Sequence, residues 1–186
     1  MRFAYYERLS PAHKRIYRRS DEIAVLALPP GVELGPTVAT IRSSLADDRR
    51  NELQRACQDL CDSLTGGYHV PPVRLIVLAQ RPSDDYGELH GLYEPEEGRR
   101  AKITVWMRTA AKQQVVAFKS FLRTVVHELG HHLDYELFAF EETFHTEGFY
   151  KRESSLANAL FVQESASVQA SPVAAPGDRA SRNRAG

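Results

Sequence analysis

Residues 121–138, FLRTVVHELGHHLDYELF, form the stretch from which the rest of the chain can be interpreted. Its apolar residues recur at the three- and four-residue spacing of a helix that turns one face to a protein core. The same stretch contains three histidines and three acidic residues. Because burying ionisable side chains is unfavourable unless a partner satisfies them, we expect these groups to share a ligand or to bond one another.

Two of these histidines stand at a spacing typical of metal ligands. His127 and His131 are one helical turn apart, so they lie on the same side of a helix predicted over residues 113–138. Two imidazoles in this arrangement can bind one tetrahedral Zn²⁺, and Glu128 can reach a water on that ion. The H-E-L-G-H segment matches the zinc peptidase signature and predicts His127 and His131 as metal ligands, with Glu128 as the catalytic residue.

A catalytic zinc site needs a third protein ligand and an open fourth position. His145 is the preferred candidate, because the segment before it leaves room for the predicted helix to end and the chain to turn back. Phe149, four residues later, would fix a returning helix in the core. Glu153 is the alternative third ligand, and Glu141 and Glu142 are further candidates.

Three other ionisable residues lie in or near the motif. Asp134 lies on the ligand-bearing side of the predicted helix, as a direct ligand, as an acceptor for an imidazole N–H, or as a surface residue of the helix without a role at the site. His132 points away from the two ligand positions and is expected to be structural. Arg152 would pair with Glu153 or with Asp134, and the sequence does not decide between them.

The composition indicates one soluble globular domain. The 186 residues are 42% hydrophobic and 26% charged, and 24 basic residues balance 24 acidic ones. This balance argues against a globally basic nucleic-acid binder. No apolar run suits a signal peptide or a membrane span, and Cys57 and Cys61 fit a reducing compartment as packing residues on a helix. We therefore expect a cytoplasmic protein without membrane association.

Apolar runs and turn residues predict the remaining elements. A helix should begin at Pro11, with Ser10 as its N-cap. The other elements follow in chain order: a helix over residues 41–64, a buried strand over 73–79, two antiparallel strands within 87–95 and 101–109, and a shorter helix over 150–165. We expect a single α+β domain, residues 1–165, with a small, mostly antiparallel sheet. Residues 166–186, rich in Ala, Ser, Pro and Arg, are predicted to be a disordered tail.

The H-E-L-G-H motif with a downstream histidine resembles the zincin metallopeptidases, and within them the SprT-like and WLM-type minimal domains. In those domains the HExxH helix is followed by a histidine with an aromatic residue four positions later, as His145 and Phe149 stand here. Four segments also look like an uncharacterised group of bacterial HExxH proteins: GELHGLYEP, ITVWMRTA, FLRTVVHELGHHLDYELF and FHTEGFYKRESSL. The resemblance covers about residues 70–160 and implies a zincin-like fold.

The chain departs from the SprT-like proteins because no Cys-rich zinc ribbon follows the motif, so the resemblance does not imply DNA-linked activity. ImmA-type peptidases, which combine HExxH with a downstream glutamate, are a second comparison. They would place the third ligand at Glu153.

The resemblance implies a zinc metallopeptidase that acts on polypeptides, with Glu128 as general base and Zn²⁺ held by His127, His131 and His145. In zincins the substrate lies as an extra strand along the sheet edge above the zinc helix, and GELHGLYEP or ITVWMRT would offer that edge. The candidates for stabilising the developing oxyanion are Tyr150, Tyr135 and His90.

Three other functions compete with this hypothesis. A zincin-fold binding module without catalysis would have no use for the intact Glu128, whereas a zinc hydrolase of a non-peptide bond is compatible with the motif. A regulator could dock through the tail or through the basic face of the first helix. The metal could also be manganese or iron, because imidazoles suit several ions. The oligomeric state stays open.

Overall fold

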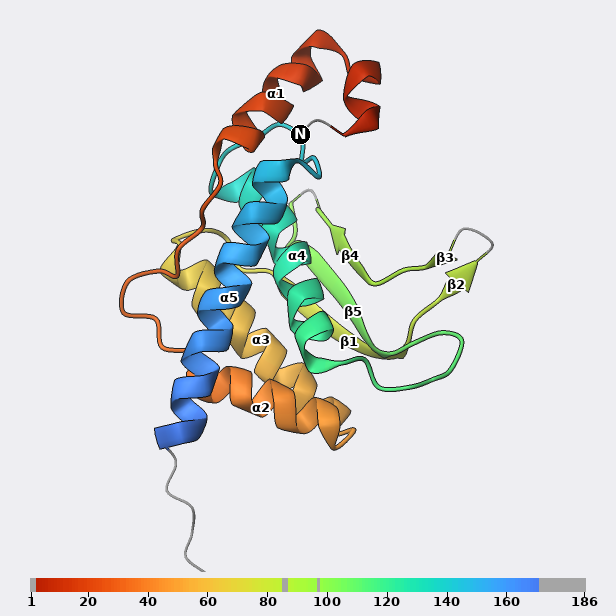
Figure 1. Cartoon of the computed structure of the whole chain (residues 1–186), viewed down its shortest axis with the longest axis vertical. Helices are drawn as coiled ribbons and strands as arrows, with labels where there is room; N and C mark the ends of the chain where they lie inside the picture. The colour runs from red at the N-terminus through yellow and green to blue at the C-terminus, as the bar shows by residue number, and fades with distance from the viewer. Residues whose placement is uncertain (1–2, 85–86, 97, 171–186) are drawn as a thin grey trace, which may run out of the picture.

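The computed structural model describes residues 3–84, 87–96 and 98–170. Within these residues the chain forms an α+β fold with five α-helices and a small three-stranded sheet (Figure 1). A short two-stranded hairpin, β2 (Ser83–Asp84) with β3 (Gly87–Glu88), extends from it. The α+β class agrees with the prediction from sequence.

The N-terminal region begins with a 3-10 helix, η1 (Ala4–Arg8), followed by α1 (Pro11–Glu22). The side chain of Ser10 caps α1 by accepting a hydrogen bond of 3.1 Å from the backbone N–H of His13, which confirms the predicted start. A long connection then leads from α1 to α2 (Gly35–Ala46).

The prediction of a single helix over residues 41–64 is wrong. The structure has two helices there, α2 and α3 (Arg50–Gly67), separated by a turn. The turn places Asp48 at a φ of 58°, in the left-handed region that aspartate tolerates better than most residues. Because neither proline nor glycine marks this break, the helical pattern runs across it in the sequence.

The sheet has the order β1-β5-β4 and is mixed, not mostly antiparallel. The strand β4 (Gly91–Glu94) pairs antiparallel with β5 (Lys102–Arg108), as predicted for these two segments. The strand β1 (Arg74–Gln80) pairs parallel with β5 on its other side. Since β5 is central, ITVWMRT cannot serve as the free edge, and that alternative was wrong.

The outer edge of β1 is covered by two glutamines of α3, one helical turn apart. Gln54 accepts from the N–H of Val77 at 2.6 Å and donates to the carbonyl of Leu75 at 2.6 Å. Gln58 accepts from the N–H of Leu75 at 2.8 Å and donates to the carbonyl of Val73 at 2.9 Å. The two side-chain amides therefore take the place of a neighbouring strand.

The metal-motif helix α4 (Phe118–Glu136) lies between the sheet and α5 (Glu147–Ala170) (Figure 1). Its apolar face is fully buried: Phe121, Leu122, Val125, Val126, Leu129 and Leu133. The helix begins later than the predicted residue 113, because Val115 forms a β-bridge with Arg108 instead. Cys57 and Cys61 pack in the same core as free thiols.

The C-terminal helix α5 is longer than the predicted residues 150–165. It continues through Ala170, so residues 166–170 are helical and do not belong to a disordered tail. This stretch contains neither glycine nor proline, and Pro172 follows shortly after it in sequence. The rest of the predicted tail, residues 171–186, lies outside the described residues. None of the helices in the described part has the length and apolarity needed to cross a membrane.

Candidate metal centre

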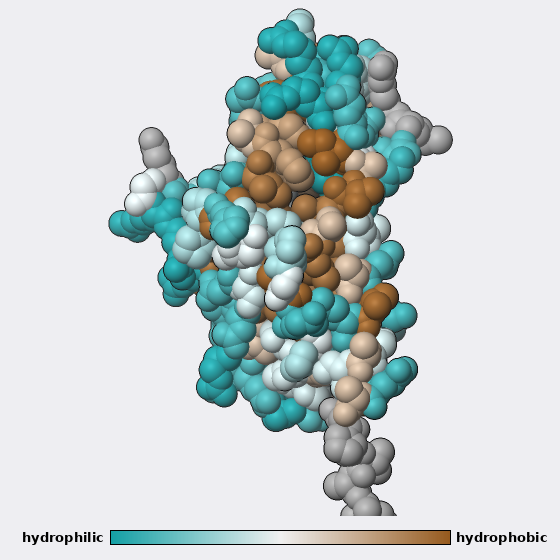
Figure 2. All heavy atoms as spheres, turned by 90° about the vertical axis from the view of Figure 1, so that its left-hand side faces the viewer, coloured by the Kyte–Doolittle hydropathy of each residue, from teal (hydrophilic) through white to brown (hydrophobic). Residues whose placement is uncertain are grey.

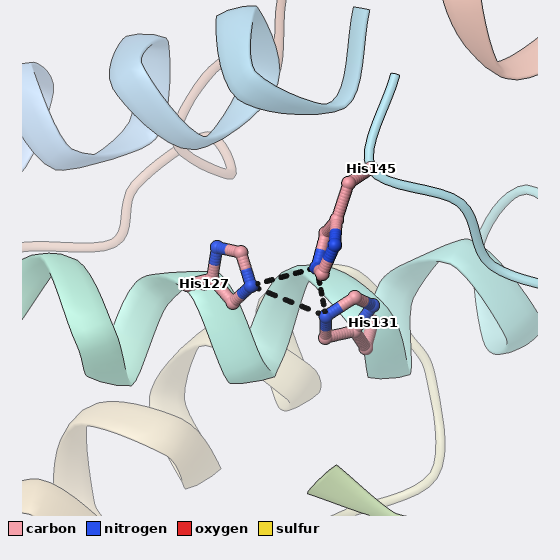
Figure 3. A group of neighbouring side chains, drawn as sticks. All are labelled: His127, His131 and His145. Carbon is pink, nitrogen blue, oxygen red and sulfur yellow. Dashed lines mark hydrogen bonds between the residues drawn. The ribbon is translucent and has the colours of Figure 1, made fainter. Parts of the chain in front are cut away.

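Three imidazoles meet beside α4. His127 and His131 project from that helix, and His145 reaches them from the loop that connects α4 to α5 (Figure 3). The Nε2 atom of His127 lies 3.0 Å from Nε2 of His145 and 3.3 Å from Nε2 of His131. The third separation, between His131 and His145, is 3.1 Å. These three side chains lie close enough together to bind one metal ion.

The other ring nitrogens of the two helix histidines face hydrogen-bond acceptors. Nδ1 of His127 lies 2.9 Å from Oε2 of Glu153, an atom that accepts when the carboxylate is ionised. Nδ1 of His131 lies 2.9 Å from the hydroxyl of Thr143, which itself donates to Oδ2 of Asp134 at 2.9 Å. With each Nδ1 atom as the donor to its acceptor, the Nε2 atoms of both imidazoles present a lone pair to the common centre.

This convergence fits a metal ion. Two unprotonated nitrogens facing each other repel unless a cation lies between them. Nitrogens bound at ~2.0–2.1 Å to a tetrahedral Zn²⁺ are roughly 3.3 Å apart, close to the separations found here. Burial, followed by the charges of His127 and His145, lowers the pKa of His131 to about 3, and burial also lowers the pKa of His145. At His131 and His145 the neutral imidazole that metal binding requires is thus favoured at neutral pH.

Glu128 lies next to this centre, packed against the edge strand β4. Its carboxylate is so close to Gly91 that a Cβ atom there would come within 2.4 Å of Oε1. Burial raises the pKa of Glu128 to about 7, while His127 and a backbone hydrogen bond from Tyr93 lower it. A carboxyl group with a pKa near neutrality can both take up and return a proton.

A cleft of about 610 Å³ opens over the histidines. Residues 89–93, which include the start of β4, form one wall, and α4 forms the other. His90 and Tyr135, two of the candidate oxyanion donors, line the cleft, whereas Tyr150 stacks on His145 at a ring separation of 5.8 Å. The hydroxyl of Tyr135 donates to Glu142 at 2.9 Å.

The remaining candidate residues have other partners. Glu153 bonds the Nδ1 side of His127 and lies outside the group of converging nitrogens. The carboxylate of Glu141 lies 3.9 Å from the guanidinium of Arg19 in α1. His132 is buried, as expected for a structural residue, and its two ring nitrogens lie 2.8 Å from the carbonyl of Pro71 and 3.1 Å from the hydroxyl of Tyr93.

A buried ion pair supports the loop behind the centre. Arg152 donates to Oδ1 of Asp134 at 2.7 Å, and both side chains are almost inaccessible, at 3% and 1% exposed. Asp134 therefore reaches His131 through the hydroxyl of Thr143, as an acceptor behind the imidazole. Of the two partners left open for Arg152, the structure selects Asp134.

Phe149 forms the floor under all three imidazoles. Its ring centroid lies 5.0 Å from that of His127, 4.8 Å from that of His131 and 5.4 Å from that of His145. A Cβ atom at Gly130 would approach this ring to 3.2 Å. The absence of a side chain at Gly130 therefore leaves room for the ring of Phe149.

Sequence patterns missed two residues that shape the centre. Gly91, the first residue of β4, lies inside the segment 87–95 predicted to contain a strand, and a glycine there often indicates close approach of another group, so that signal was present in the sequence. Thr143 lies in a loop where nothing local distinguishes it.

Comparisons of the chain with models of protein families, with curated proteins and with solved structures gave no match.

Proposed function

We propose that this protein is a zinc metallopeptidase with a zincin-like fold, of the SprT-like and WLM type, that hydrolyses peptide bonds in polypeptides. The observation that carries the proposal is the convergence of three histidine Nε2 atoms beside the buried carboxylate of Glu128, inside an open cleft. A site that only held a metal for structure would gain nothing from that carboxylate.

His127, His131 and His145 would hold the ion, and Glu153 and Thr143 would keep the first two imidazoles in the required tautomer. When bound there, Zn²⁺ supplies Lewis acidity, which polarises the scissile carbonyl and lowers the pKa of a water ligand. Glu128 accepts a proton from the attacking water while the oxygen of that water forms a bond to the carbonyl carbon. Glu128 then donates that proton to the amine nitrogen as the C–N bond breaks.

The position of β4 supports an extended peptide as the substrate. This strand forms one edge of the sheet and contributes Gly91, Leu92 and Tyr93 to the cleft wall. A peptide can add to such an edge through main-chain hydrogen bonds. The exposed side chains of Leu89 and Leu92 offer apolar contacts to it. A strand edge beside the centre favours a peptide over a compact non-peptide substrate.

The first experiment is to measure the metal content of protein purified without chelators or an affinity metal. We expect about one zinc per chain in the wild type and in Glu128→Gln, and none in His145→Ala. Glu153→Gln should retain metal with lower affinity, because it removes an orienting acceptor and not a ligand. Loss of zinc from Glu153→Gln with retention in His145→Ala would contradict the three-histidine centre. Manganese or iron in the wild type would correct the identity of the ion.

Activity is then tested with a library of unstructured peptides. Wild-type protein should cleave, and zinc-loaded Glu128→Gln should be slower by roughly 100-fold or more. Equal cleavage by both proteins would remove Glu128 from the mechanism. A zinc-loaded wild type that cleaves no peptide would reject the peptidase and favour the non-catalytic binding module. Cytoplasmic location stays a prediction.

A further inference from the structure

The N-terminal segment, residues 3–22, packs directly on the loop that carries the third histidine. The hydroxyl of Tyr5 donates to the backbone carbonyl of His145 at 2.8 Å. Around this bond the rings of Phe3 and Tyr150 lie 5.9 Å apart, and those of Tyr17 and Phe144 lie 6.3 Å apart. The segment therefore contacts the main chain of His145 and packs its aromatic rings on the neighbouring Phe144 and Tyr150.

The adjoining ends of α1 and α5 complete each other's hydrogen bonds. The backbone N–H of Gly148, in the first turn of α5, donates to Oδ1 of Asp21 at 2.8 Å. In return, Arg152 donates to the carbonyls of Ser20 at 2.6 Å and Ile23 at 2.7 Å, at the end of α1. The contact is so close that a Cβ atom at Gly148 would lie 2.4 Å from the carbonyl oxygen of Ser20.

This contact is separate from the main core. Tyr6, Ile16 and Tyr17 are buried, yet they do not belong to the core cluster formed by the sheet and helices α2 to α5. Figure 1 shows α1 at one end of the molecule, joined to the rest by a long connection. The surface view in Figure 2 shows a mostly hydrophilic region at that end and apolar surface gathered below it. Burial of the segment therefore depends on the contacts of the histidine loop and the start of α5.

We propose that residues 3–22 are a positioning element of the metal centre, in which Tyr5 holds the main chain of His145 so that docking of the segment and metal binding stabilise each other. The proposal rests on the metal centre of the proposed function, and it does not require peptide hydrolysis. His145 lies in a connection, residues 137–146, without helix or strand of its own, so its imidazole must be ordered before it can join the other two. Because coupling between two sites is reciprocal, metal binding must also favour the docked segment.

The first test compares Tyr5→Phe with Tyr68→Phe as a matched control. Tyr68 also donates its hydroxyl to a backbone carbonyl, that of Ala27 at 2.7 Å, but it lies in a different part of the molecule. Each full-length protein is titrated with Co²⁺, and binding is measured from the visible absorption of the bound ion. Zn²⁺ affinity is measured in competition with a chelator. We expect Tyr5→Phe to bind both ions roughly fivefold to tenfold more weakly and Tyr68→Phe to bind them as the wild type does.

The second test uses the wild type alone, so it stands even if a variant does not fold. Amide hydrogen exchange of residues 11–22 is measured with and without saturating Zn²⁺. Exchange should slow by at least about fivefold with the metal. Equal metal affinities of the two tyrosine variants would show that Tyr5 does not position the metal centre. Unchanged hydrogen exchange on metal binding would overturn the coupling. A wild type that binds neither ion would overturn the metal centre, whereas binding without coupling would overturn this inference alone.

Discussion

The hydroxyl oxygen of Thr143 lies 2.9 Å from Nδ1 of His131. The same hydroxyl donates to Asp134, which in turn pairs with Arg152, so a chain of polar contacts runs from the imidazole to a buried ion pair. Such a chain fixes both the tautomer and the orientation of the ring before any ion is bound.

Replacing Thr143 by valine should therefore weaken metal binding by roughly tenfold or more, because His131 loses its acceptor while the shape of the residue is retained. Thr143→Ser keeps the hydroxyl and should bind metal nearly as well as the wild type. Zinc affinity measured by chelator competition checks both variants. Equal affinities of the valine and serine variants would show that the hydroxyl has no part in orienting the ligand.

Gly91→Ala should disturb Glu128 more than it disturbs the fold. The added Cβ would meet Oε1 at 2.4 Å and Cγ at 2.7 Å, so the carboxylate must move away from Gly91 and leave its present position. We expect peptide cleavage to fall by roughly 100-fold while zinc content stays the same, with a loss of about 1–3 kcal/mol in stability.

Gly66→Ala is the control for this substitution. Nothing lies within 4 Å of a Cβ at Gly66, which is helical, so alanine there should raise stability by roughly 0.5–1 kcal/mol and leave activity unchanged. Unfolding in urea and cleavage of a peptide measure both variants. Full activity in Gly91→Ala would mean that Glu128 does not need its present position.

Arg152→Met should be strongly destabilising, because it leaves the buried carboxylate of Asp134 without its partner and the end of α1 without its donor. Breaking a buried pair from one side typically costs about 3–5 kcal/mol in the free energy of unfolding. Its neighbour Lys151 pairs with Glu147 on the surface, and Lys151→Met should produce no measurable change. Urea unfolding of the two metal-free variants measures their free energies of unfolding. Similar stabilities of Arg152→Met and Lys151→Met would contradict a structural role for the buried pair.

The two cysteines should be unreactive in the folded protein. Burial raises the pKa of the Cys61 thiol to about 12, and it raises the pKa of Cys57 as well. The folded state thus disfavours the thiolate. Stability from this source is complete below the ordinary pKa of ~8.5 and declines as the pH rises above it.

Labelling with a thiol reagent at pH 7 and pH 8 tests this expectation. Native protein should react slowly at both values, whereas the chain in denaturant should react nearly tenfold faster at the higher pH. Rapid labelling of the native protein at pH 7 would show that this part of the core opens readily.

The parts of the fold that could be predicted have strong local signals. Ser10 and Pro11 mark the start of α1, and the β-branched run of β1 indicates a buried strand. The break near Asp48 was missed because a single residue with positive φ leaves no trace in an otherwise helical pattern. The parallel pairing of β1 with β5 was missed because it depends on contacts between segments far apart, with β4 between them in the chain.

In the candidate site, too, the residues related by local spacing could be predicted, and those brought together by the course of the chain could not. Helix geometry alone places His127 and His131 together, and local spacing was enough to predict that pair. Which downstream residue meets them depends on the course of residues 137–146, and the sequence left His145 and Glu153 as alternatives. The structure brings both to His127, His145 at Nε2 and Glu153 at Nδ1. The hydrogen bond from Tyr5 could not be foreseen, since it joins residues 140 positions apart in the chain.

The glutamine side chains along β1 have a consequence for how molecules of this protein can associate. Strand addition between copies builds an open-ended polymer when every sheet offers two edges. In this sheet Gln54 and Gln58 cover one edge, and among the described residues β4 has a strand partner on one side. Growth by edge-to-edge addition of these sheets is therefore expected to stop at two molecules, because in a pair joined through β4 the remaining edges are covered by glutamine side chains over residues 73–77.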